Sequence, residues 1–126
     1  MNENPFSIIG PKGPQSSKAI TEVMGATTDE KIKNIIHSGR IVLFMKGSAD
    51  MPQCGFSANT CAILDSLGAE YNTFDILQNP EIRQGVKEYS NWLTFPQLYI
   101  EGELVGGNDI VTQMYHQGEL QKLIKD

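Results

Sequence analysis

Cysteine is scarce in this sequence, which has 126 residues and only two cysteines, Cys54 and Cys61. A small secreted domain stapled by disulfides would contain more, so we expect a reducing compartment, which is the cytoplasm or, alternatively, the mitochondrial matrix. The N-terminus lacks the apolar stretch of a secretory signal. Nor does any apolar run approach the roughly 18 residues that span a bilayer, so we expect no membrane segment.

Positive charge is also in short supply, because ten Lys and Arg stand against fifteen Asp and Glu. The formal net charge is −5, and the basic residues form no stripe along the chain. Nucleic acid is therefore not expected as a partner. The 40% hydrophobic and 20% charged residues are ordinary for one globular domain.

Two regions are predicted, a flexible tail over residues 1–26 and a folded domain over residues 27–126. Proline, glycine and serine recur in the first region and interrupt any regular element. Thr27 and Glu30 have the spacing of a capping box, which marks the start of a helix.

The pattern along the domain predicts the order α-β-α-β-α-β-β-α. Strands separated by helices favour parallel pairing, and a final hairpin adds an antiparallel strand. After the helix that begins at residue 28, the expected elements are a strand at 41–45, a helix at 54–67, a strand at 71–76, a helix at 80–89, strands at 97–100 and 103–105, and a helix from residue 108 with a break near Gly118.

Cys54 lies where a loop enters the second predicted helix. Free N–H groups and the positive end of a helix stabilise a thiolate there, which favours a reactive cysteine over a small core residue. Ser57 stands where a Cys-x-x-Cys motif has its resolving thiol, so this motif cannot form its own disulfide. Cys61 lies two turns further, about 10 Å away along a helix. A disulfide requires less than about 7 Å, so we predict that Cys61 is a core thiol.

Four short motifs occur in the order found in monothiol glutaredoxins of the CGFS type. They are Lys46-Gly47, Pro52-Gln53-Cys54-Gly55-Phe56-Ser57, Thr94-Phe95-Pro96-Gln97 and Gly106-Gly107-Asn108-Asp109. The chain resembles that family over about residues 28–125. The resemblance implies an α/β, thioredoxin-like fold with a central four-stranded mixed sheet flanked by helices, and it also implies a glutathione site.

The resemblance implies which residues contact glutathione, from its glycine carboxylate through its cysteinyl segment to its γ-glutamyl end. In that order they are Lys46 and Arg83, then the Phe95 backbone with a cis-Pro96, and then Asn108 and Asp109. The alternative is that these residues are solvated charges, a turn and a strand-edge proline. Two positions depart from the family pattern, because Leu93 stands where a proline is frequent and Asn108 stands where a cysteine is frequent.

A 2Fe-2S cluster needs four ligands, usually thiolates. One copy of this chain offers Cys54 alone, whereas two copies with two glutathiones supply four, which fits the bridged homodimer of the family. We therefore expect a carrier that transfers the cluster to apo iron-sulfur acceptor proteins and pairs with a BolA-like protein. Two alternatives remain open, a glutathione-dependent thiol–disulfide oxidoreductase of weak activity and a non-catalytic adaptor with a thioredoxin fold.

Overall fold

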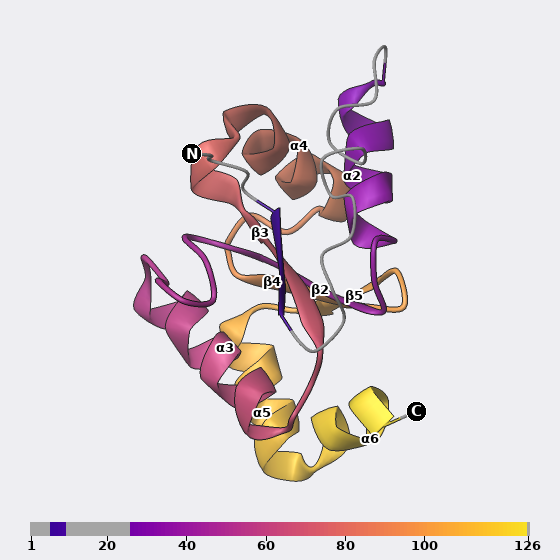
Figure 1. Ribbon diagram of the computed structural model, residues 1–126. Helices are drawn as coiled ribbons and strands as arrows, with labels where there is room; N and C mark the ends of the chain where they lie inside the picture. Colours follow the sequence, from indigo (N-terminus) through magenta and orange to yellow (C-terminus); the bar gives the residue numbers. More distant parts are fainter. Residues whose placement is uncertain (1–5, 10–25, 126) are drawn as a thin grey trace.

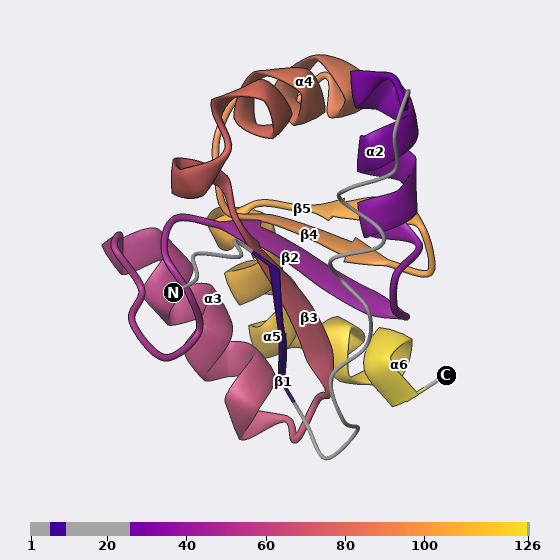
Figure 2. The ribbon, with the colours of Figure 1, turned by 45° about the horizontal axis from the view of Figure 1, so that its top comes forward.

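A central sheet lies between two layers of helices in the computed structural model, which describes residues 6–9 and 26–125 (Figure 1). Helices α2 and α4 cover one face, and α3, α5 and α6 cover the other (Figure 2). The elements are β1 (Phe6–Ile9), α2 (Thr28–Ile36), β2 (Ile41–Met45), α3 (Gly55–Ser66), β3 (Tyr71–Asp75), the 3-10 helix η1 (Ile76–Gln78), α4 (Pro80–Ser90), β4 (Gln97–Ile100), β5 (Glu103–Gly106), α5 (Asn108–Gln117) and α6 (Glu119–Lys125). None of the helices in these ranges is long and apolar enough to cross a membrane.

The sheet is mixed, and its strand order is β1-β3-β2-β4-β5. The four predicted strands are all present, and β1 adds a fifth at one edge, antiparallel to β3. Residues 6–9 therefore differ from the tail that we predicted over residues 1–26. The rest of that predicted tail, residues 1–5 and 10–25, lies outside the described residues.

The direction of β4 corrects one expectation from the sequence. β2 and β3 are parallel, as predicted for strands joined by a helix, but β4 runs antiparallel to β2 although α4 precedes it. The chain therefore leaves β3 and enters β4 at the same end of the sheet. The chain changes direction over residues 91–96. In this segment the backbone of Asn91 has a left-handed conformation and the Phe95–Pro96 peptide is cis. This path brings the loop before β4 to the end of the sheet where β2 runs into the Cys54 loop.

Local signals in the sequence explain where the helices begin. At α2 the Thr27 side chain accepts a hydrogen bond from the N–H of Glu30, whose side chain accepts one from the N–H of Thr27. This is the predicted capping box. At α4 the Asn79 side chain accepts from the N–H of Ile82, and Pro80 is the first helical residue.

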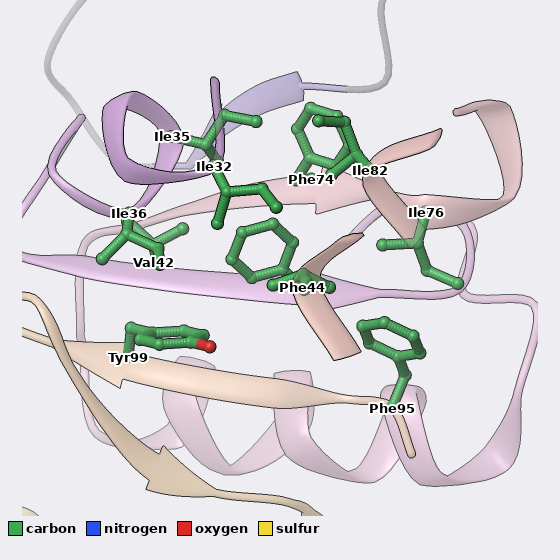
Figure 3. Close-up of a cluster of buried hydrophobic side chains, with 11 residues drawn as sticks. Ile32, Ile35, Ile36, Val42, Phe44, Phe74, Ile76, Ile82, Phe95 and Tyr99 are labelled. Carbon is green, nitrogen blue, oxygen red and sulfur yellow. The ribbon is translucent and has the colours of Figure 1, made fainter. Parts of the chain in front are cut away.

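Successive side chains along each strand point to opposite faces of the sheet, so the hydrophobic core has two halves, one on each face. In β2, Val42 and Phe44 face α2 and α4, whereas Leu43 and Met45 belong to the opposite cluster. Figure 3 shows the first cluster, in which the Phe44 ring stacks at a tilt on Phe74 and edge-on to Tyr99. A sheet that is buried on both faces is a rigid base for the loops at its ends.

Candidate functional site

Cys54 lies at the amino end of α3 as its N-cap residue, as the sequence predicted. The thiol is partly exposed, and its pKa is lowered, chiefly because the backbone N–H of Ser57 donates a hydrogen bond to the sulfur. Partial burial acts in the opposite direction, while the N–H of Phe56, the charge of Lys46 and the Ser57 hydroxyl also lower the pKa. A thiolate forms more readily here than in water, and the thiolate is the form that attacks disulfides and binds metals.

Ser57 is fully buried beneath Cys54. Its hydroxyl oxygen accepts a hydrogen bond from the backbone N–H of Lys46 at 3.2 Å, and its side chain also contacts the Cys54 sulfur. The serine therefore links the end of β2 to the thiol at the start of α3.

The loop between β2 and Cys54 is held by several backbone contacts. The N–H of Gln53 donates to the carbonyl oxygen of Lys46 at 2.8 Å, and Gly47 pairs with Pro52 in an isolated bridge. Gly47 has a φ of +89°, and a Cβ at this position would lie 2.5 Å from the carbonyl oxygen of Met51. Only glycine fits this turn without strain.

Two predicted cations, Lys46 and Arg83, are partly buried and form no ion pair among the described residues. Lys46 follows β2 and acts electrostatically on Cys54, whereas Arg83 lies in the second turn of α4. An unpaired, partly desolvated cation attracts a carboxylate more strongly than one in open water. Both side chains are therefore free to bind an anionic ligand.

The peptide before Pro96 is cis, as the resemblance implied. Gln97 follows it in the Thr94-Phe95-Pro96-Gln97 motif. The sequence did not predict the structural role of this side chain. Its side chain is fully buried and donates to the carbonyl oxygens of Trp92 at 2.8 Å and Thr94 at 3.3 Å. The Tyr99 hydroxyl in turn donates to Gln97 at 3.1 Å. Gln97 therefore fixes the loop that enters β4.

A cavity of about 400 Å³ opens between this loop, the start of α3 and the start of α5. Most of its walls are apolar, and Asp109 contributes a carboxylate. The lining residues are Phe56, Trp92, Thr94, Phe95, Gly107, Asn108, Asp109 and Ile110. The structure thus brings three predicted site residues, Phe95, Asn108 and Asp109, to one cavity, whereas Lys46 and Arg83 are not part of its lining.

Asn108 is the first residue of α5, where the sequence predicted a helix to begin, and Gly107 is the N-cap. The Asn108 side-chain oxygen accepts hydrogen bonds from Asn59 at 2.8 Å and from Thr60 at 3.2 Å, both on α3. Asn108 therefore ties α5 to α3 at the edge of the cavity. Within residues 6–9 and 26–125 its amide nitrogen donates to no protein group, so we expect it to be available to a ligand.

Cys61 is a core thiol, as predicted. It is 3% exposed and donates a weak hydrogen bond to the sulfur of Met45 at 3.6 Å. Burial raises the pKa of this thiol, which opposes thiolate formation. No group of three or more His, Cys, Asp or Glu side chains within residues 6–9 and 26–125 is arranged to hold a metal ion.

Comparison with known proteins gives consistent results. Residues 41–105 match the family model described as glutaredoxin. The chain is 54% identical over 101 residues to glutaredoxin 4 of Escherichia coli K12, which covers 80% of this chain and 88% of the relative. It is 52% identical over 96 residues to a probable monothiol glutaredoxin 2 of Rickettsia felis, which covers 76% and 92%.

Solved structures agree in fold. The solution structure of reduced poplar apo GrxS14 has a TM-score of 0.67 at 48% identity and covers 85% of this chain and 94% of that one. A buckwheat glutaredoxin–glutathione complex has a TM-score of 0.70 at 25% identity and covers 78% and 87%. The thioredoxin-like fold implied by the sequence is therefore confirmed.

Proposed function

Because the chain belongs to the glutaredoxin family and groups with its monothiol members, we propose that it binds glutathione beside Cys54 and carries a 2Fe-2S cluster between two copies of itself. Delivery of that cluster to apo iron-sulfur acceptor proteins is the proposed role. A BolA-like protein is a proposed alternative partner for one copy, and the cytoplasm or the mitochondrial matrix is the proposed location.

The observation that carries this proposal is the solitary, activated thiol. Cys54 is partly exposed at a helix end, whereas Cys61 is buried and Ser57 occupies the position of a resolving thiol. One copy can therefore offer one thiolate to a cluster that needs four ligands. Two copies and two glutathione thiolates complete the set, and the partial exposure of Cys54 is consistent with contact between its sulfur and a shared cluster.

The proposed glutathione site is supported by the arrangement of charges and cavity. Lys46 and Arg83, which form no ion pair within residues 6–9 and 26–125, are the proposed partners of the glycine carboxylate, and Asn108 and Asp109 line the cavity proposed for the γ-glutamyl end. Phe95, before cis-Pro96, lines the same cavity, and its backbone would pair with the cysteinyl segment. A related fold is known in complex with glutathione, in the buckwheat protein.

Anaerobic reconstitution with ferrous iron, sulfide and glutathione tests the proposal. We expect a visible absorption band and a dimer in gel filtration that contains two glutathiones, whereas Cys54→Ser remains colourless and monomeric. Cys61→Ala is the matched control and keeps the cluster. A cluster that formed equally well without glutathione, or in a stable monomer, would refute the proposal.

A second function is supported by the lowered pKa of Cys54, which favours thiol–disulfide exchange. The Cys54 thiolate attacks the glutathione sulfur of a glutathionylated protein, whose own sulfur leaves as a thiolate. Because this motif lacks a resolving thiol, the thiolate of a free glutathione must then attack the glutathione sulfur bound to Cys54. The mixed disulfide breaks, oxidised glutathione forms and Cys54 leaves as a thiolate. Mass spectrometry of the glutathione adduct on Cys54, during turnover, tests this activity.

A further inference from the structure

Asp75 is a buried carboxylate at the end of β3, 7% exposed. One carboxylate oxygen, Oδ1, accepts hydrogen bonds from the backbone N–H groups of Gly47 and Leu77, each at 2.9 Å. The other, Oδ2, accepts from the Gln78 side-chain amide at 3.2 Å. The contact with Gly47 crosses from β3 to the turn that follows β2.

No cation pairs with Asp75 among the described residues, since the two ion pairs there join Lys31 to Glu81 and Arg40 to Glu101. A buried carboxylate without a cation is costly unless its oxygens are hydrogen-bonded. Three neutral donors satisfy Asp75 instead. Through these hydrogen bonds the Asp75 side chain connects the turn after β2 to η1 at the end of the sheet.

The backbone that Asp75 organises belongs to Lys46 and Gly47. Lys46 is held at its N–H by the Ser57 hydroxyl and at its carbonyl oxygen by the N–H of Gln53. Asp75 holds the next N–H, that of Gly47, from a third segment of the chain. In the sheet, Met45 lies directly opposite Asp75, so the carboxylate meets the chain just where β2 ends.

We propose that Asp75 is a positioning residue: by holding the N–H of Gly47 it fixes the direction in which Lys46 leaves the sheet, and so sets how well the site binds the glycine carboxylate of glutathione. This inference rests on the proposed glutathione site. Asp75 itself does not touch the ligand, and its effect passes through the lysine.

Thiol–disulfide exchange with two different disulfides separates positioning from a general structural role. In each reaction the Cys54 thiolate attacks one sulfur, the S–S bond breaks, a mixed disulfide forms and the other half leaves as a thiolate. Oxidised glutathione carries the glycine carboxylates, whereas hydroxyethyl disulfide carries no charge. The ratio of the two second-order rate constants, followed by mass spectrometry, therefore measures recognition of the charged ligand.

We expect Asp75→Ala to lower the rate with oxidised glutathione roughly three- to tenfold, in line with the loss of one hydrogen bond. The rate with hydroxyethyl disulfide should change less than about twofold, because Cys54 keeps the N–H donors of α3. Because Lys46 also lowers the pKa of Cys54, the comparison is made at a pH where the thiol is fully ionised. Lys46→Ala should then give a similar selective loss, and the double variant should lose little more than either single one. Asp75→Asn keeps an acceptor for Gly47 and should restore most of the selectivity.

Equal losses with both disulfides, or additive losses in the double variant, would overturn the inference. Asp65→Ala is the matched control, because Asp65 accepts a hydrogen bond from the Tyr71 hydroxyl at the other end of β3 and should leave the ratio unchanged. If Asp75→Ala does not fold, Asp75→Ser is the second variant. Serine is a good helix cap, and we expect its shorter side chain to keep the contact with Leu77 and to lose the contact with Gly47.

The result for the wild-type protein shows whether the proposed glutathione site is wrong or only the proposed role of Asp75. A wild-type protein without preference for oxidised glutathione would overturn the glutathione site and this inference together. A wild-type preference that Asp75→Ala leaves intact would overturn the inference alone.

Discussion

The hydroxyl oxygen of Ser57 accepts a hydrogen bond from the backbone N–H of Lys46 at 3.2 Å, and this contact joins the start of α3 to the end of β2. The same side chain contacts the Cys54 sulfur and helps to lower the pKa of the thiol. A hydroxyl both accepts and donates strong hydrogen bonds, whereas a thiol does both weakly. Ser57, which stands in the position of a resolving thiol, therefore also helps to stabilise the thiolate of Cys54.

Ser57→Ala should raise the pKa of Cys54 and destabilise the fold. The variant loses the hydroxyl contact with the sulfur, and it leaves the N–H of Lys46 without its acceptor, at a cost of about 1–3 kcal/mol. The pH dependence of Cys54 alkylation by iodoacetamide, together with urea denaturation, measures both effects. Ser66→Ala is a suitable control, because Ser66 lies at the other end of α3. An unchanged alkylation profile in Ser57→Ala would contradict this account.

Gly47 and Gly55 flank the reactive loop, and replacement by alanine should destabilise the protein at Gly47 but have little effect at Gly55. Gly47→Ala places a Cβ against the backbone of Met51 at a positive φ, so we expect a loss of about 2–4 kcal/mol. Nothing lies within 4 Å of a Cβ at Gly55, in the first turn of α3, so Gly55→Ala should stay within about 1 kcal/mol of wild type. Urea denaturation of the two variants compares them directly, and similar losses would show that the turn adapts.

Gln97→Leu should loosen the loop before Pro96. The carbonyl oxygens of Trp92 and Thr94 lose their buried donor, and we expect a loss of about 2–4 kcal/mol with faster hydrogen exchange over residues 91–96. Tyr99→Phe removes a single hydrogen bond to the same side chain and should cost about 1 kcal/mol. Exchange that rises equally throughout the domain would indicate global destabilisation instead.

The lowered pKa of Cys54 predicts a pH-dependent contribution to stability. Because the folded thiol has a pKa below the unfolded value of about 8.5, thiolate formation favours the folded state above that value. The contribution is lost as the pH falls through the folded pKa. The difference in unfolding free energy between wild type and Cys54→Ser should therefore grow from pH 6 to pH 9. A difference that stays constant over this range would place the thiol in an unperturbed environment.

Much of the secondary structure could be predicted because the signals are local. The capping box at Thr27, the Asn79-Pro80 helix start and the apolar run of β2 all depend on neighbouring residues. The predicted strand at 71–76 ends one residue early, at Asp75, because the Asp75 side chain caps the turn of η1. Strand β1 was missed, since a short segment gains its structure only from the edge of β3.

The candidate site likewise combines features that the sequence predicts with contacts that it does not. The place of Cys54 at a helix start followed from the pattern, and the cis-Pro96 peptide followed from the resemblance. The contacts of Asp75 and Gln97 could not be foreseen. Asp75 meets Gly47 from 28 residues away, and Gln97 acts on a loop whose path depends on the unexpected antiparallel direction of β4.

The burial of Cys61 has a consequence for the kinetic order of oxidation. With one reachable thiol in each molecule, every disulfide that this protein makes under native conditions joins it to another molecule. Oxidation is then a second-order event, so its rate rises with the concentration of the partner and falls on dilution. The disulfide form is therefore always a conjugate, heavier than the chain itself, and its abundance depends on the concentration of the thiols and disulfides around the protein.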